Sequence, residues 1–120
     1  MVLFDTNAIL RYILQDNHEM AEAVEQQLSE HICYIPVEVV AEVVYVLSKV
    51  YNIERNVLAQ IVIDVTHTDK ISVEKSNIVR YALGVFASSR LDFVDCLLVG
   101  YAKEKQYSIF TFDKKLKRYL

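Results

Sequence analysis

VLFDTN, at residues 2–7, joins an apolar strand directly to the start of a helix. The three apolar residues fit a buried strand, and Asp5, Thr6 and Asn7 are residue types that cap helix N-termini. The apolar-rich residues 8–14 then predict the helix itself. A strand that leads straight into a helix is half of a βαβ unit, so this stretch favours an α/β fold.

Strand and helix patterns alternate along the rest of the chain. Short apolar runs predict strands at residues 2–4, 32–35, 71–73 and 107–112. Longer segments predict helices at residues 8–14, 18–30, 36–50, 54–66, 75–89 and 93–105. The valine-rich segment 36–50 is assigned to a helix because it is longer than an ordinary strand. Strands joined by helices form right-handed crossovers, so we predict a three-layer α/β/α sandwich with a central parallel sheet of four to five short strands.

The length and composition indicate one compact domain over residues 1–120. Hydrophobic residues make up 53% of the chain and charged residues 24%, which argues against intrinsic disorder. No apolar run reaches the ~18 residues of a membrane span. The start has no export signal, so we expect a cytoplasmic protein. Cys33 and Cys96 lie in apolar surroundings, which predicts buried thiols and not a disulfide or a zinc site.

The charge of the chain is unevenly distributed. The net charge is −3, which argues against a strongly basic protein that coats nucleic acid. Six of the 13 basic residues nevertheless lie between Lys103 and Arg118. This basic segment has two interpretations, a solvated helix face and a surface that binds phosphates, and the two are compatible.

Four acidic residues, Asp5, Glu42, Asp95 and Asp113, are the candidates for a functional site. Asp5 and Asp113 follow predicted strands, Asp95 begins a helix, and Glu42 lies within one. Ligands of open parallel sheets bind outside the carboxyl ends of the strands, so these side chains can converge. Converging carboxylates repel one another, and a set of oxygen ligands favours Mg²⁺ or Mn²⁺ as the neutralising ion. Each acid also has a simpler interpretation as a helix cap or an exposed polar residue.

The order of these motifs resembles that of PIN-domain ribonucleases. VLFDTNAIL at residues 2–10 resembles the opening motif of that family, and VVAEV at 39–43 is similar to its helical acidic motif. LDFVDCLLVGYA at 91–102 and IFTFD at 109–113 resemble the third motif and the strand-to-loop signature that follows it. The resemblance covers nearly the whole chain, whose size is most similar to the VapC-like toxins of type II toxin–antitoxin pairs.

The resemblance implies a metal-dependent endoribonuclease that hydrolyses RNA phosphodiester bonds. The residues implied for catalysis and for binding Mg²⁺ or Mn²⁺ are Asp5, Glu42, Asp95 and Asp113. The residues expected to support them are Thr6, Asn7, Asp92 and Thr111. The residues expected to contact the RNA backbone are Arg11, Lys114 and Lys115. The implied partners are RNA, a small antitoxin protein and a second copy of the chain, which forms a homodimer.

Two features depart from the family pattern. Asp92 precedes Asp95 by three residues, so both acids are candidate ligands, although the apolar run after Asp95 matches the motif better. The chain also ends soon after Asp113, where many relatives continue into another short strand. We therefore expect a smaller sheet with an exposed edge that a partner or a second copy covers.

Two other functions stay open at this point. A phosphatase of the haloacid dehalogenase type, or a phospho-receiver domain, also places an Asp at the end of a strand. The phosphatase pattern needs a second Asp where this chain has Asn7. A non-catalytic module with the same fold would bind RNA or protein without hydrolysis. The choice of RNA and of cleavage site stays open because phosphate contacts carry no sequence information.

Overall fold

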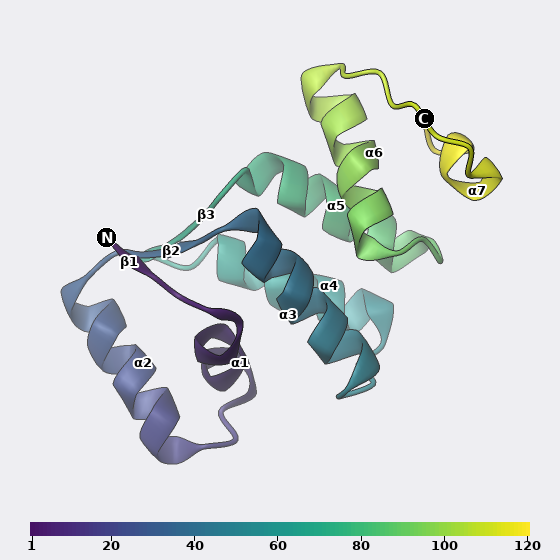
Figure 1. The fold of residues 1–120 in the computed structure, drawn as a ribbon. Helices are drawn as coiled ribbons and strands as arrows, with labels where there is room; N and C mark the ends of the chain where they lie inside the picture. The colour runs from purple at the N-terminus through teal and green to yellow at the C-terminus, as the bar shows by residue number, and fades with distance from the viewer.

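The computed structural model describes all 120 residues, which form three short strands and seven helices (Figure 1). The strands are β1 (Val2–Leu3), β2 (Cys33–Ile35) and β3 (Ile71–Val73). The helices are α1 (Thr6–Leu14), α2 (His18–Glu30), α3 (Val37–Lys49), α4 (Arg55–Thr66), α5 (Ser76–Ser88), α6 (Phe93–Lys105) and α7 (Lys114–Lys117). The predicted helices are therefore confirmed, including the valine-rich one, with small shifts at their ends.

The three strands form one parallel sheet in the order β1-β2-β3. Val2 of β1 is paired with Cys33 of β2, and Cys33 is paired with Ile71 of β3. Helices connect the strands, as parallel pairing requires, so the predicted α/β class and parallel sheet are confirmed. The predicted count of four to five strands is wrong, because the sheet contains three.

The predicted strand at residues 107–112 is the one that does not form. This segment has neither helical nor strand structure, and none of its backbone groups takes part in a backbone–backbone hydrogen bond. The segment follows Gln106 at the end of α6. The φ of Gln106 is 56°, which lies in the left-handed region, so the chain changes direction at this residue. A strand needs a neighbour, and in Figure 1 this segment runs from α6 to α7, away from the sheet. The aromatic and β-branched residues of this segment therefore favour an extended backbone, but they do not determine a neighbouring strand with which it could pair.

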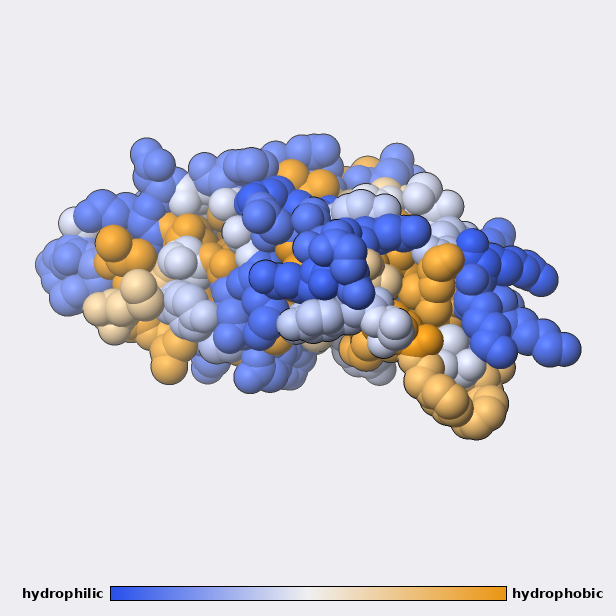
Figure 2. All heavy atoms as spheres, turned by 90° about the horizontal axis from the view of Figure 1, so that it is seen from above, coloured by the Kyte–Doolittle hydropathy of each residue, from blue (hydrophilic) through white to orange (hydrophobic).

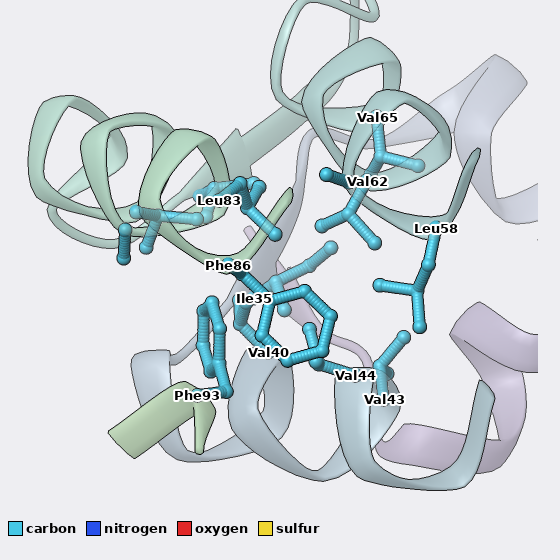
Figure 3. Close-up of a cluster of buried hydrophobic side chains, with 14 of the residues drawn as sticks. Ile35, Val40, Val43, Val44, Leu58, Val62, Val65, Leu83, Phe86 and Phe93 are labelled. Carbon is cyan, nitrogen blue, oxygen red and sulfur yellow. The ribbon is translucent and has the colours of Figure 1, made fainter. Parts of the chain in front are cut away.

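The hydrophobic core lies where the sheet meets α3, α4 and α5. Figure 3 shows Ile35 of β2 converging with Val44 of α3, Leu58 of α4 and Phe86 of α5. Phe93, the first residue of α6, meets Phe86 edge to face with ring centroids 5.9 Å apart. No polar or charged residue is buried in this core. The first turn of α6 is thus fixed by apolar packing, which matters because the acidic residues of that turn belong to the candidate site.

Helices α5 and α6 approach closely at one glycine. A Cβ atom built on Gly100 of α6 would lie 2.9 Å from the backbone carbonyl oxygen of Ile78 in α5. Gly84 of α5, by contrast, has no atom within 4 Å of such a Cβ. The missing side chain at Gly100 is therefore what allows α6 to pack at this distance.

Two further expectations concern the thiols and the membrane. Cys33 and Cys96 are free and completely buried, which confirms the prediction of buried thiols. The structure has no helix whose length and apolar character would let it cross a membrane.

Candidate active site

Asp5 follows β1 and caps α1. Its Oδ1 accepts a hydrogen bond of 2.9 Å from the backbone N–H of Ala8, so the capping interpretation is confirmed for this residue. Thr6 and Asn7 form the first turn of α1. Asp5 is exposed, and its second carboxylate oxygen makes no hydrogen bond with the protein. Capping therefore leaves this side chain an oxygen that is open to a ligand.

Glu42 lies in the middle of α3 and is exposed. The start of this helix has no side-chain cap from Pro36. Instead, Oε1 of Glu74 accepts a hydrogen bond of 2.9 Å from the backbone N–H of Val37. This bond is the main reason that the pKa of Glu74 lies below its ordinary value. The helix that carries Glu42 is thus fixed to the end of β3 by a charged hydrogen bond.

Asp92, Asp95 and Asp113 lie close enough for their charges to interact. Asp92 is the N-cap residue of α6, and Asp95 lies in the first turn of that helix. Burial is the largest cause that raises the pKa of Asp95, and the negative charges of Asp113 and then Asp92 raise it further. A carboxyl group crowded by like charges is stabilised in its ionised form by a nearby cation, so this neighbourhood favours cation binding.

Asp113 caps α7. Its Oδ1 accepts hydrogen bonds from the backbone N–H groups of Lys115 at 2.8 Å and Leu116 at 3.1 Å. The hydroxyl of Thr111 accepts a bond of 3.0 Å from the backbone N–H of Asp113, so Thr111 shapes the turn that carries this acid. Leu116 is almost completely buried and anchors α7. Asp113 is therefore held in place although it is exposed.

A cavity of about 340 Å³ lies between α3 and the start of α6. Asp92 and Asp95 line it from α6, and Tyr45 and Lys49 line it from α3. Arg55, the first residue of α4, also lines it. The cavity thus combines two carboxylates with two cationic and three aromatic side chains. Cationic and aromatic groups suit a phosphate-bearing ligand.

The sequence analysis did not identify Tyr45, Lys49 or Arg55 as residues of this site. Arg55 is held by three contacts. Its Nε donates a hydrogen bond of 2.8 Å to the backbone carbonyl of Phe86, and its Nη2 donates to the carbonyl of Leu91. Its guanidinium carbon also lies 3.6 Å from the centre of the Phe86 ring. Burial lowers the pKa of Arg55. A lone arginine at a helix start, where the macrodipole disfavours a cation, was the only available signal.

The four predicted ligands are not assembled in one place. The structure contains no group of three or more His, Cys, Asp or Glu side chains that could hold a metal ion. The pKa of Asp95 responds to Asp113 but to neither Asp5 nor Glu42. The donor set nevertheless consists of carboxylate oxygens, and this chemistry fits Mg²⁺ or Mn²⁺. The predicted metal site therefore stays a prediction.

The basic residues predicted to contact RNA fall into two kinds. Arg11 pairs with Asp16, with 2.7 Å between Nη1 and Oδ1, and its Nη2 donates a bond of 3.3 Å to the hydroxyl of Tyr51. The bond to Tyr51 is the largest cause that raises the pKa of Arg11. Lys114 and Lys115, by contrast, are exposed on α7. Both lysines are therefore more accessible to a polyanion than Arg11 is.

The parallel sheet and its helical crossovers define an α/β domain, a class in which ligands bind outside the carboxyl edge of the sheet. The model of the PIN domain family matches the chain over residues 2–119, so the chain belongs to the PIN domain family. It is 27% identical to the VapC ribonuclease of Aquifex aeolicus (strain VF5), over 98% of this chain and 91% of that protein. No solved structure matches the chain. The family predicted from the four motifs is therefore confirmed.

Proposed function

We propose that the chain is an endoribonuclease dependent on Mg²⁺ or Mn²⁺, and that it is the toxin of a toxin–antitoxin pair. The observation that carries this proposal is the crowding of Asp95 by Asp113 and Asp92 at the start of α6. A helix cap needs one acceptor, whereas the negative charges of two further acids near Asp95 favour a cation in this neighbourhood. Membership of the PIN domain family and the likeness to a VapC ribonuclease support the same activity.

The metal would be held by Asp5, Glu42, Asp95 and Asp113. When bound, the ion would supply an activated water and offset the charge of the phosphate. A bound cation would offset the repulsion that helps to raise the pKa of Asp95 and would therefore favour its ionised form. Asp92 lies in the same neighbourhood and would orient water or Asp95 itself.

The supporting residues act through the turns that carry the ligands. Thr6 and Asn7 would keep Asp5 at the end of β1, because they form the first turn of the helix that it caps. Thr111 would keep Asp113 in position through the bond between its hydroxyl and the Asp113 backbone. The proposed site therefore depends on two short capped turns as well as on the carboxylates.

The RNA backbone would approach through cationic side chains on both sides of the acids. Lys114 and Lys115 directly follow Asp113, and Lys49 lines the same cavity as Asp95. Phosphate contacts by such lysines give binding that weakens as salt increases. Arg11 is already paired with Asp16, so we assign it a smaller share of this binding.

The partner of the toxin would be a small antitoxin protein in the same cytoplasm. Binding of this partner over the acidic site would block access of RNA. A short neighbouring gene that encodes a DNA-binding protein would support the pairing. The direct check is whether the product of that gene copurifies with the chain and stops RNA cleavage.

Cleavage of RNA by purified protein tests the proposed function. Wild-type protein with Mn²⁺ should cut a structured RNA, and chelation of the metal should stop the reaction. Asp95→Asn should abolish cleavage, while Asp69→Asn, an exposed acid in the turn before β3, is the matched control and should cut like wild type. Equal cutting by the Asp95 variant would refute the assignment, and RNA binding without cutting would instead indicate a non-catalytic module.

A further inference from the structure

A second cavity, of about 500 Å³, lies between the loop that joins α5 to α6 and the helix α7. Three cationic side chains line it: Arg90 of the loop, Lys115 of α7, and Arg118, the residue that ends α7. No aspartate or glutamate lines this cavity. Figure 2 shows hydrophilic side chains that project at the end of the molecule that carries α7. Positive charge is therefore concentrated at one place in a chain whose net charge is −3.

The three cations of this cavity have no anionic partner in the protein. None of the four ion pairs of the structure involves Arg90, Lys115 or Arg118. The side chains of these residues also donate no hydrogen bond to the protein, unlike those of Arg11 and Arg55, which each donate two. Like charges that gather without a counter-charge repel one another, so this cavity favours an anionic ligand.

Another cavity with two lysines differs in this respect. Lys75 and Lys105 line a cavity at the start of α5, but Glu104 lines it as well. Lys75 also pairs with Glu74, with 3.8 Å between Nζ and Oε2. The positive charges there are offset within the protein, whereas those beside α7 are left for a ligand.

The donors of the cationic cavity suit a phosphate group. Each guanidinium presents a planar fork of N–H donors, and the lysine adds a compact ammonium group. The hydroxyls of Ser89 and Tyr119 line the same cavity. The Ser89 Oγ accepts a bond of 3.2 Å from the backbone N–H of Leu91, and a hydroxyl that accepts can still donate its hydrogen. A phosphate has oxygens on several sides and can use donors from both walls of the cavity, whereas a carboxylate has two oxygens in one plane.

The two elements that line this cavity also carry acids of the candidate active site. Arg90 precedes Asp92 by two residues, and Lys115 follows Asp113 by two residues. Asp92 lines the acidic cavity together with Arg55, and the charge of Arg90 acts on Arg55. The cationic cavity is therefore a neighbour of the acidic residues, although it contains none of them.

We propose that the cavity between the α5–α6 loop and α7 binds an internal phosphate of an RNA strand, of which a nearby phosphate lies at the acidic residues. The choice of RNA as the ligand rests on the proposed function, whereas the anion site rests on the cavity itself. Arg90 and Arg118 would hold this phosphate from two different elements, with Lys115 beside them. Such a contact would fix the register of the strand relative to the acids and would carry no information about the bases.

Binding of a short, fluorescently labelled single-stranded RNA tests this site by anisotropy. EDTA is present throughout, so that the readout is binding and not cleavage. We expect Arg90→Gln and Arg118→Gln each to weaken binding about tenfold, the size expected when a hydrogen bond from a charged donor is lost. The slope of log affinity against log salt should fall by about 0.7 for each lost contact. Both side chains are exposed and make no bond in the protein, so the melting temperature should stay unchanged.

Lys115→Gln and Lys117→Gln form the matched pair of variants. They remove the same charge from the same short helix, but only Lys115 lines the cavity. We expect Lys115→Gln to weaken binding more than Lys117→Gln. Equal losses from the two would show a diffuse attraction without a defined site and would overturn the proposal. Wild-type affinity of both arginine variants would overturn it as well.

Two further arms identify the ligand. The RNA is prepared with and without a 5′-phosphate, and both forms should lose the same affinity in Arg90→Gln. A loss confined to the 5′-phosphorylated form would place a terminal phosphate in the cavity and would overturn the internal assignment. A poly-glutamate peptide that binds as tightly as RNA, and through the same arginines, would indicate an acidic protein as the ligand and would also overturn it.

The proposed nuclease activity is measured separately, with Mn²⁺ in place of EDTA. Wild-type protein that binds RNA through the arginines but does not cut it would refute the nuclease and leave this phosphate site intact. Wild-type protein that cuts RNA, with both arginine variants binding normally, would refute the phosphate site alone.

Discussion

Replacement of Arg55 should destabilise the fold and displace the acidic turn at the start of α6. This guanidinium donates to the carbonyls of Phe86 and Leu91 and covers the ring of Phe86 at 3.6 Å. It therefore joins α4 to the end of α5 and to the loop between α5 and α6, and this loop leads directly into Asp92 and Asp95. Arg55→Met keeps most of the apolar stem and removes all three polar contacts at once.

The size of the effect follows from these contacts. A hydrogen bond from a charged donor contributes about 1.5–3 kcal/mol, and a partly buried cation–π contact adds about 1–2 kcal/mol. Burial of the cation offsets part of this gain, as the lowered pKa of Arg55 shows. We therefore expect Arg55→Met to lower the free energy of unfolding by about 2–4 kcal/mol. With an unfolding entropy of ~2.1 cal/mol/K per residue, the melting temperature should fall by roughly 8–16 °C.

Urea denaturation followed by circular dichroism measures this change, and calorimetry gives the melting temperature. Arg55→Lys is the informative second variant, because a lysine keeps the charge but loses the fork that reaches two carbonyls. Arg55→Lys should therefore keep less than half of the unfolding free energy that Arg55→Met loses. A fall of under ~3 °C for Arg55→Met, or full stability of Arg55→Lys, would show that the guanidinium contacts do not hold this loop, given the scale of ~4 °C per kcal/mol for this size.

Three further predictions concern packing, pH and thiol reactivity. Gly100→Ala should lower the free energy of unfolding by about 1–3 kcal/mol, because the added Cβ meets the backbone of α5. Gly84→Ala should leave the free energy of unfolding unchanged or raise it by up to about 1 kcal/mol. Urea titrations of the two variants compare these effects. The pKa of Glu74 is lower in the folded state than in the unfolded state. The hydrogen bond of Glu74 to Val37 should therefore stabilise the fold at pH values above the unfolded-state pKa of Glu74, and this stabilisation should be lost as the pH falls through its folded-state pKa. Glu74→Ala should flatten that part of the curve of stability against pH. Burial raises the pKa of Cys96 to about 11, so this thiol should react with a thiol reagent at pH 8 only after unfolding in urea.

The helices could be predicted from the sequence because the signals for them are local. Amphipathic periodicity and capping residues act within a few turns, and they identified α2 at Glu30 and α6 at Phe93 with no error in the boundary. Length was the deciding signal for α3, where valine alone would have favoured a strand. The three strands of the sheet follow from the same local patterns, because β1 leads directly into α1, and β2 and β3 each lie between two helices.

The candidate site shows a different limit. The two interpretations of Asp5 and Asp113, cap and ligand, are compatible, because each uses Oδ1 for the cap and keeps the other oxygen. Sequence order identified the acids but not their distances, which depend on how α6 and α7 sit relative to the sheet. Arg55 was not identified because its partners are backbone carbonyls far along the chain. Every residue has a backbone carbonyl, so the residue types do not indicate which carbonyls accept these bonds.

The segment at residues 107–112 shows why local sequence pattern cannot determine strand pairing. Aromatic and β-branched residues favour an extended backbone at 107–112, but the neighbouring strand is chosen by where the two ends of the segment are held. Those ends are held by Tyr107 on Tyr101 and by the buried Leu116, and both contacts join residues whose proximity depends on the tertiary fold. The separation of Asp113 from Asp5 has the same cause as the missing fourth strand, because Asp113 follows this unpaired segment whereas Asp5 follows β1.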